Sequence, residues 1–321
     1  MGPSPSVSHR QQVRRPALGP AVACLALLAW ALIGPAHAHA ATREYWIAAV
    51  NTQWDMAPNG GDAVMGTTIP PAQRRFTAVV YRRYTPGFRR PWPNTAVSGD
   101  NDGMPGPTIR AEVGDTVVVH FRNRDHHYGL RHSMHFHAFR YLPSSDGAFI
   151  PFRSGRGGDV PVGGRWTYRL RAVADSYGVW PYHDHSSTMG QSIELGLFGA
   201  IVIPKPGEPR PDREFVVYLN NQKGFDTING HAFIGNTPTF RAKVGETVQW
   251  DVLALGENFH VFHVHGHRWL RDGAPTDSEL LGPSSTLKVR WLEDVPGVWY
   301  WHCHVESHQD NGMIGLYRVS R

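Results

Sequence analysis

Residues 107–117 read PTIRAEVGDTV, and residues 238–248 read PTFRAKVGETV, 131 positions later. Further matches follow in the same order: His-x-His at 135 and 263, Gly-Val-Trp at 178 and 297, and Gly-Leu-aromatic at 196 and 315. Collinear matches over this length indicate an internal duplication. The chain is therefore predicted to contain two copies of one module.

Each copy is rich in β-strand signals. Residues 117–121 (VVVHF) and 247–252 (TVQWDV) are β-branched and aromatic, and residues 166–171 and 287–291 alternate between polar and apolar side chains. Turn signals such as Val-Gly-Asp separate these runs, and no stretch shows a sustained helical period. The expected fold class is all-β, with two antiparallel β-sandwich domains of the Greek-key type.

A proline-rich segment marks the boundary between the two copies. Residues 204–212 read PKPGEPRPD, which favours an extended, semi-rigid linker. We expect the first domain to span residues 41–205 and the second to span residues 206–321. The Gly-rich residues 146–164 are predicted to form a surface loop in the first domain.

The N-terminal 40 residues have the order of an export signal. Arg10, Arg14 and Arg15 precede an apolar run over residues 17–33, and an Ala-rich segment ending at Ala38 or Ala40 offers the cleavage site. A membrane anchor is the alternative, and the twin-arginine and general export routes both stay open. We expect a periplasmic or extracellular protein that is free of the membrane once the signal is removed.

Removal of the signal also changes the charge of the chain. The formal net charge falls from +5 to +2, because residues 1–40 carry three Arg and no acidic residue. The remaining chain has no Lys/Arg cluster that would favour nucleic-acid binding.

Histidine is the residue type that points to chemistry. The chain has 19 His, and four His-x-His pairs lie at equivalent places in the two copies. Residues two apart on a strand face the same way, so each pair presents two imidazoles on one face. The pairs are His135 and His137, His183 and His185, His263 and His265, and His302 and His304. Their repetition predicts a metal site.

A second site is indicated by Cys303, which stands between His302 and His304 and faces the opposite way on a strand. His308 and Met313 follow it, and His260 precedes the third His-x-His pair. Two imidazoles, one thiolate and a weak axial thioether are the ligands of a blue-copper electron-transfer site.

Together these segments resemble the four copper signatures of the multicopper oxidases. They are His260-x-x-His263-x-His265, the run from His302 through Cys303 and His308 to Met313, and the two N-terminal His-x-His pairs. The length, with two domains, resembles the small bacterial laccases. The resemblance implies cupredoxin-like domains, four coppers per protomer, and oxidation of phenols or aromatic amines coupled to reduction of O2 to water.

The resemblance also implies a role for each ligand. A type 1 copper takes electrons from the substrate and passes them through Cys303 to a trinuclear cluster bound by its two neighbours in sequence. The implied ligands are His260, Cys303, His308 and Met313 for type 1, His135 and His263 for type 2, and His137, His183, His185, His265, His302 and His304 for type 3. An axial Met favours a modest type 1 potential.

The first domain lacks most of the type 1 ligands. In the repeat, Asp184 stands for Cys303, Met189 for His308 and Glu194 for Met313, while His132 corresponds to His260. We therefore expect no type 1 copper in the first domain. His132 is then a relic with local hydrogen bonds, or a residue that supports the cluster.

Two further residues are candidates for the catalytic machinery. Tyr141 and Asp146 follow His137 by four and nine positions, and this spacing resembles positions near the cluster in two-domain laccases. Reduction of O2 consumes protons, so Asp146 is predicted to act as a proton relay. The alternatives are a turn residue in Ser-Ser-Asp-Gly for Asp146 and a packed aromatic side chain for Tyr141.

The assembly follows from the two-domain length. A cluster that needs histidines from both domains is expected to close between chains, and a closed ring satisfies such a head-to-tail contact. We expect a homotrimer with interchain clusters.

Three other functions stay open. They are a metallo-oxidase acting on Cu(I) or Mn(II), a copper nitrite reductase, and a copper protein that transfers electrons without turnover. The complete His183/His185 pair argues against nitrite reductase, and so does His304, which directly follows Cys303. The six Met beyond the start residue are scattered, which argues against a cuprous oxidase.

Overall fold

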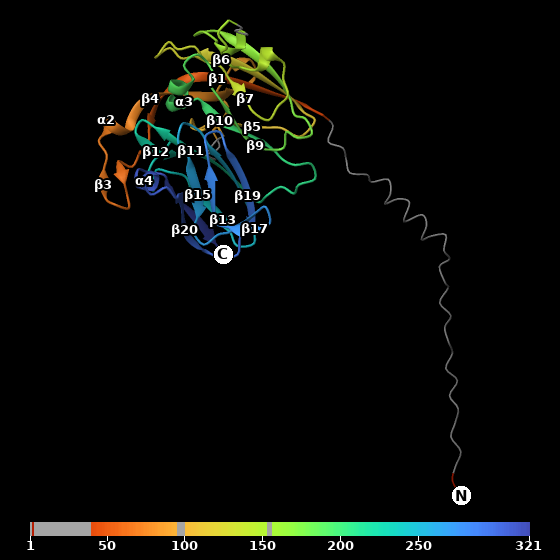
Figure 1. Cartoon of the computed structure of the whole chain (residues 1–321), viewed down its shortest axis with the longest axis vertical. Helices are drawn as coiled ribbons and strands as arrows, with labels where there is room; N and C mark the ends of the chain where they lie inside the picture. The colour runs from red at the N-terminus through yellow and green to blue at the C-terminus, as the bar shows by residue number, and fades with distance from the viewer. Residues whose placement is uncertain (1, 3–39, 95–99, 153–155) are drawn as a thin grey trace. The chain divides into compact units, whose positions relative to one another are not determined.

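The computed structural model describes residues 2, 40–94, 100–152 and 156–321 (Figure 1). The chain divides into residues 1–39 and a unit formed by residues 40–321. The predicted export signal therefore lies, except for residues 2 and 40, outside the described residues. None of the helices in the described ranges combines the length and apolar character that crossing a bilayer requires.

Two four-stranded sheets are built from the first half of this unit. Their strand orders are β4-β1-β6-β8 and β5-β10-β9-β7. The strands are β1 (Thr42–Asp55), β4 (Arg75–Tyr84), β5 (Gly106–Arg110), β6 (Thr116–Arg124), β7 (His135–Phe136), β8 (Arg165–Arg171), β9 (Gly178–His183) and β10 (Phe198–Ile203). We call this half domain 1.

The second half repeats the arrangement with one additional strand. Its sheets have the orders β12-β11-β14-β19 and β13-β21-β20-β15-β18. The strands are β11 (Arg213–Gln222), β12 (Phe225–Ile228), β13 (Thr239–Lys243), β14 (Thr247–Ala254), β15 (His260–Val264), β18 (Ser278–Leu281), β19 (Thr286–Leu292), β20 (Gly297–Cys303) and β21 (Ile314–Ser320). We call this half domain 2.

The remaining elements are short, and the longest helix among the described residues has seven residues. They are the strand pairs β2 (Gly61–Asp62) with β3 (Thr67–Thr68) and β16 (Trp269–Arg271) with β17 (Ala274–Thr276), the helices α2 (Pro71–Arg74), α3 (Met189–Leu195) and α4 (Glu306–Asp310), and the 3-10 turns η1 (Pro86–Phe88), η2 (Pro143–Ser145) and η3 (Arg156–Gly158).

The two domains share one topology, which differs from the expected antiparallel sandwiches in strand direction. The all-β, Greek-key sandwich fold is confirmed, but the sheets are mixed rather than purely antiparallel. β1 pairs in parallel with β6 and β5 with β10, and domain 2 repeats this in β11 with β14 and β13 with β21. Parallel partners need a long crossover connection, and other strands lie between the partners along the chain. Side-chain patterns report burial and not strand direction.

All four predicted strand segments lie inside observed strands, namely β6, β8, β14 and β19. In β6 the side chains of Val117, Val119 and Phe121 are buried in the domain 1 core. The core of domain 2 is more aromatic and is centred on Trp250 and Trp301, whose ring centroids are 5.2 Å apart. β-branched and aromatic residues fit a pleated surface that is buried on one face.

A third core joins the two domains. Phe198 of β10 packs on Tyr218 of β11 with ring centroids 4.8 Å apart, and the Tyr218 hydroxyl donates to Gly199 O at 2.6 Å. The indole of Trp54 donates to Gly230 O, also at 2.6 Å. The linker is bound down as well, because Arg290 donates to Pro209 O at 2.8 Å. These contacts hold the two sandwiches in one unit.

Candidate metal centres

The His-x-His pairs lie at strand ends. In each pair the first histidine is the last residue of a strand or the one before it, and the second lies just beyond the strand. After the second histidine in two equivalent pairs the backbone enters the left-handed region, at Ala138 (φ 72°) and Gly266 (φ 73°). A side chain at Gly266 would also meet the Trp299 ring, 2.8 Å from the added Cβ. The second histidine of each pair thus lies outside the regular strand, and in these two pairs a sharp turn follows it.

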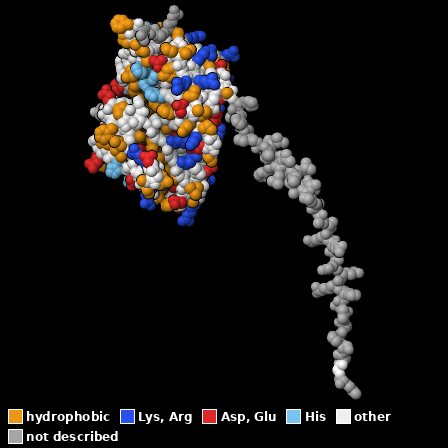
Figure 2. Space-filling view, turned by 45° about the vertical axis from the view of Figure 1, so that its right-hand side comes forward, with side chains coloured by type: hydrophobic (Ala, Val, Ile, Leu, Met, Phe, Trp, Pro, Cys, Tyr) orange, Lys and Arg blue, Asp and Glu red, His pale blue; other side chains and the backbone are white. Residues whose placement is uncertain are grey.

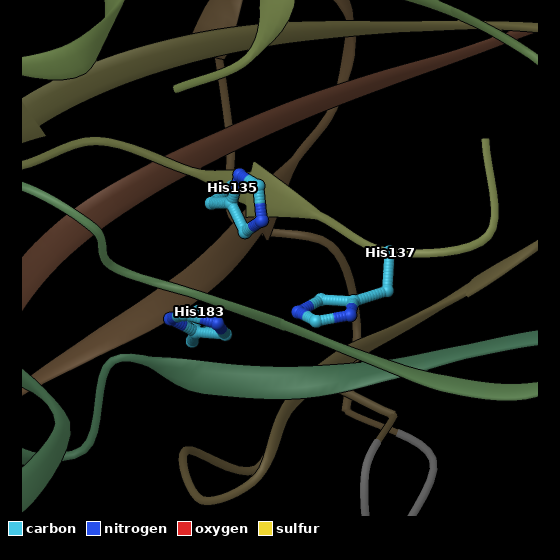
Figure 3. Close-up of side chains that lie close together, drawn as sticks. All are labelled: His135, His137 and His183. Carbon is cyan, nitrogen blue, oxygen red and sulfur yellow. The ribbon is translucent and has the colours of Figure 1, made fainter. Parts of the chain in front are cut away.

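Domain 1 brings its histidines together. One nitrogen from each of His135, His137 and His183 lies within 4.8 Å of the others, and Figure 3 shows the three rings arranged around a common space. His185 joins them, with its ring centroid 5.1 Å from that of His135. We call these four residues the domain 1 set.

Domain 2 forms a matching group. His263, His265 and His302 meet the same criterion, and the His304 ring lies 5.4 Å from both the His263 and the His302 rings. We call these four residues the domain 2 set. Several histidine side chains are visible together on one face of the molecule in Figure 2.

Main-chain carbonyls orient four of these rings, two in each set. In each case Nδ1 donates to a carbonyl oxygen, which leaves Nε2 with its lone pair free for a metal. The pairs are His135 with Asp146 O (2.7 Å), His183 with Asp184 O (2.9 Å), His263 with Asp277 O (2.7 Å) and His302 with Cys303 O (3.0 Å). Sequence reasoning did not find these acceptors, because a carbonyl group is present at every residue.

The resulting donor set fits a metal. His302 donates through Nδ1, so its Nε2 carries a lone pair, and this atom lies 3.1 Å from Nε2 of His265. Burial, together with the charges of neighbouring histidines, lowers the pKa of His137, His183 and His302 to about 4. The rings are therefore neutral near pH 7, which is the form that binds copper.

A third donor set surrounds Cys303 in the core of domain 2. Its Sγ lies 3.9 Å from Nδ1 of His260 and 3.7 Å from Nδ1 of His308. These separations suit one ion bonded to all three atoms, because metal–nitrogen and metal–sulfur bonds are about 2.0 and 2.3 Å long for zinc. Burial raises the pKa of the Cys303 thiol, and a coordinated metal reverses that shift by deprotonating the thiol.

Met313, the expected axial ligand, is joined to this set through its main chain. It is fully buried, its carbonyl accepts from Cys303 N at 3.1 Å, and its own N donates to His308 O at 2.9 Å. His308 sits on α4 and is only partly buried, so one edge of this set reaches the surface.

Two residues near His308 were not identified from the sequence. The Phe259 ring is 55% exposed and lies 6.5 Å from the His308 ring. The Asp226 carboxylate is buried, accepts from Asn311 at 2.8 Å and interacts electrostatically with His308. Asp226 comes from β12, far away in sequence, so no motif connects it with the cysteine segment.

Asp226 also lines a cavity of about 680 Å³. Its lining includes the carboxylates of Glu194, Asp226 and Glu257. A volume in this range suits a small-molecule ligand.

The two predicted catalytic residues both lie near His135. The Asp146 carboxylate is 3.4 Å from Nδ1 of His135, and the Tyr141 ring centroid is 6.4 Å from that of His135. Burial and the neighbouring Asp146 raise the pKa of Tyr141 to about 12. Asp146 also follows the turn η2, where its N donates to Pro143 O at 3.3 Å. The relay and turn interpretations of Asp146 are therefore both compatible with its position.

The domain 1 and domain 2 sets form separate groups within one chain. In the described part of the chain, every ring contact among the eight histidines stays within one set. His265 and His304 are exposed to solvent. Among the described residues the eight histidines thus fall into two groups of four.

Comparisons with known proteins agree with this architecture. Two family models, both described as multicopper oxidase, match residues 88–208 and 208–321. The human ferroxidase HEPHL1 is 28% identical over 87% of this chain. A probable nitrite reductase-hydroxylamine oxidoreductase fusion protein of Kuenenia stuttgartiensis is 29% identical over 70% of it. The chain spans only 29% and 28% of the length of these two relatives.

The fold recurs in solved structures. A crystal structure described as a multicopper oxidase superposes with a TM-score of 0.67 at 25% identity, over 87% of this chain and 89% of the other. The family models match all of domain 2 from residue 208 and domain 1 from residue 88, and the cysteine and histidine sets lie within the matched residues. The chain therefore belongs to the multicopper oxidase family and has two cupredoxin-like domains.

Proposed function

We propose that this protein is a laccase-like oxidase that removes single electrons from phenols and aromatic amines and reduces O2 to water. The observation that carries the proposal is the Cys303 donor set, which is joined through the chain to the histidine-only domain 2 set. Bound copper supplies the one-electron chemistry at the first set and the reduction of O2 at the histidine-only sets.

The donor atoms suit four coppers per protomer. His260, Cys303, His308 and Met313 would hold the type 1 ion. His135 and His263 would hold the type 2 ion, and the type 3 pair would be held by His137, His183, His185, His265, His302 and His304. Cys303 connects the sites covalently, because its two sequence neighbours belong to the histidine-only set.

The surroundings of His308 support an aromatic substrate. His308 is partly exposed, and the exposed Phe259 ring beside it offers a face on which another aromatic ring can pack. The Asp226 carboxylate interacts electrostatically with the same ligand, and we propose that it accepts the proton that a phenol loses on oxidation.

One observation favours a second candidate, a metallo-oxidase. Glu194, Asp226 and Glu257 line the 680 Å³ cavity, and carboxylates bind hard divalent cations. The human relative is named a ferroxidase. Nitrite reduction, suggested by the name of the bacterial relative, leaves the complete His183/His185 and His302/His304 pairs without a use.

Oxygen uptake by the copper-reconstituted full chain tests these alternatives. We expect intense blue absorption and O2 uptake that depends on dimethoxyphenol. We expect Phe259→Ala to raise KM for this phenol several-fold and to leave iron(II) oxidation unchanged. Uptake with iron(II) but not with the phenol, with Asp226→Asn abolishing it, would select the metallo-oxidase. Nitrite consumption without phenol-dependent O2 uptake would reject both oxidases.

Asp146 is proposed as a proton donor to the O2-reducing centre. Asp146→Asn removes the titratable group and keeps the main-chain carbonyl that orients His135. We expect kcat to fall roughly 10²-fold, the lower end of typical acid–base contributions, while copper content stays at the wild-type value. Wild-type kcat in this variant would leave Asp146 with only its turn role.

We propose that the histidine-only centre closes between protomers in a homotrimer, with domain 1 of one chain meeting domain 2 of the next. The grouping of the histidines into two sets within one chain supports this arrangement, and so do exposed apolar side chains on β20, which carries His302, and on β18, which pairs with the strand of His263. Val298 and Tyr300 on β20 and Leu280 on β18 are 57, 44 and 61% exposed, and the Tyr300 ring lies 5.7 Å from the His265 ring. Exposed apolar patches of this kind mark interaction surfaces.

Mixing two inactive variants tests the interchain centre. His185→Ala damages only the domain 1 set, and His304→Ala damages only the domain 2 set. Co-assembled trimers would contain intact interfaces that pair one undamaged set from each variant. Random assembly in a closed ring predicts about a quarter of the wild-type O2 uptake. If each chain built its own centre, every centre would carry one defect and co-assembly would restore nothing.

The lowered histidine pKa values predict how acid affects the copper-free protein. The pKa of His183 and of His260 lies at about 4 in the fold because both rings are buried, against an ordinary value of 6.5. Between these values the unfolded chain binds protons that the folded chain excludes. The free energy of unfolding should therefore decrease as the pH falls from 6.5 to 4.

Thermal unfolding of the copper-free full chain over this range measures the effect. His260→Gln should make the pH dependence shallower, whereas His126→Gln, at an exposed position, should leave it unchanged. Copper should raise the melting temperature most at the upper end of this pH range, because copper binding requires neutral imidazole. Equal slopes in the two variants would contradict the assignment.

The arginine-led N-terminal segment supports the proposal that the protein is exported and acts in the periplasm or outside the cell. With no cluster of basic side chains in the rest of the sequence, we propose O2 and a small reductant, and not nucleic acid, as its partners.

A further inference from the structure

Domain 1 contains a buried group of polar residues at the place where domain 2 carries its cysteine site. The internal repeat aligns His132 with His260, Ser133 with Val261, and Asp184 with Cys303. His132, Ser133 and Asp184 are completely buried. None of them belongs to the three metal-donor groups found among the described residues.

Two contacts of the cysteine site in domain 2 have counterparts at the equivalent place in domain 1. In domain 2, Val261 N donates to Cys303 Sγ at 3.3 Å, and Nδ1 of His260 lies 3.9 Å from the same sulfur. In domain 1, Ser133 N donates to Asp184 Oδ1 at 2.6 Å, and Nδ1 of His132 lies 3.7 Å from the same oxygen. The two sites share one backbone geometry, and a carboxylate stands where the other has a thiolate.

Other residues complete an ionic arrangement around His132. Its Nε2 lies 3.0 Å from Oδ2 of Asp125, so the ring lies between two buried carboxylates. Burial opposes the charged imidazolium, but hydrogen bonds to Asp125 and Asp184 outweigh it and raise the pKa of His132. Ser192 Oγ, 3.3 Å from Nδ1, occupies a further side of the ring. The two nitrogens of His132 thus face two carboxylates and a hydroxyl group, whereas Nδ1 of His260 faces the Cys303 sulfur.

This network extends to the metal-binding histidines. Asp184 lies between His183 and His185 in the chain, and its carbonyl orients the His183 ring. Its carboxylate accepts from Ser133 N and from Ser186 Oγ, the latter at 2.6 Å. Ser133 Oγ in turn accepts from His185 N at 3.0 Å. The carboxylate thereby ties the segment that leads into His135 to the segment that carries the other histidine pair.

We propose that Asp184, charge-balanced by His132, is a positioning residue that clamps the domain 1 histidines into their metal-binding arrangement without a metal of its own. The place in domain 1 that is equivalent to the Cys303 site thus supports the neighbouring histidine centre. This role rests on the proposed function, because it assumes that the domain 1 set contributes to the O2-reducing copper centre. It also resolves the two interpretations of His132, which acts through its local hydrogen bonds and thereby supports the cluster.

Two substitutions separate the clamp from a general effect on folding. Asp184→Ala removes both acceptor oxygens, whereas Asp184→Asn keeps one oxygen for Ser133 N and loses the charge. Asp175→Ala is the matched control at an exposed position in the same domain. The readouts are the blue absorption of the copper on Cys303, which lies in domain 2 and serves as an internal reference, the electron paramagnetic resonance signal of copper bound by histidines alone, and O2 uptake.

We expect Asp184→Ala to keep the blue absorption and to weaken copper binding at the histidine-only centre by roughly 10–100-fold, the usual effect of losing a group that orients ligands. Asp184→Asn should lie between this variant and wild type, and Asp175→Ala should match wild type. Wild-type copper binding in Asp184→Ala, or a proportional loss of both signals in Asp184→Ala and Asp184→Asn, would overturn the clamp. A wild-type protein that shows the blue absorption without the histidine-only signal would instead refute the proposed function.

Discussion

The hydrogen bonds from histidine Nδ1 to main-chain carbonyls are the constraint on which the metal chemistry of this protein depends. A neutral imidazole has one donor and one acceptor nitrogen, so a carbonyl that takes the donor leaves the acceptor for copper. The rings of His135, His263 and His302 are held in this way at strand ends. Their acceptors are the carbonyls of Asp146, Asp277 and Cys303. Burial adds a second condition, because it keeps the rings uncharged. The sandwiches serve to place these carbonyls, which is why both domains use the same topology.

Duplication of one module explains how a single backbone supports two chemistries. In domain 2 the position between two histidines is Cys303, a soft ligand that faces the core and meets His260 and His308. In domain 1 the same position is Asp184, a hard, charged group that cannot be buried without partners. Ser133 N, Ser186 Oγ and the His132 ring satisfy it, and Asp125 in turn binds the other side of that ring. The change of one side chain therefore required the rest of its environment to become polar.

A hydrophobic core between the domains joins the two sandwiches. Phe198, Tyr218 and Leu253 bury the contact between the two sandwiches, so the domain 1 and domain 2 sets are carried on one unit. Within that unit His265 and His304 of the domain 2 set are exposed to solvent, whereas the histidines of the domain 1 set are buried or partly buried. One unit therefore carries both histidine groups, and exposed apolar side chains lie beside the domain 2 set.

The sequence by itself determined the duplication, the all-β class, the position of the strands around residues 117, 166, 247 and 287, and the residue types of the metal sets. These follow from local patterns, namely alternation, His-x-His spacing and the cysteine between two histidines. Strand direction did not follow, since alternation shows which face of a strand is buried, whichever way the neighbouring strand runs. Only the tertiary structure placed Asp226 beside His308, chose main-chain carbonyls as the partners of the ring nitrogens, and joined His132 to Asp184 and Asp125. Each of these depends on chain segments that are distant in sequence or on backbone atoms that every residue possesses, and neither leaves a signal in the order of the side chains.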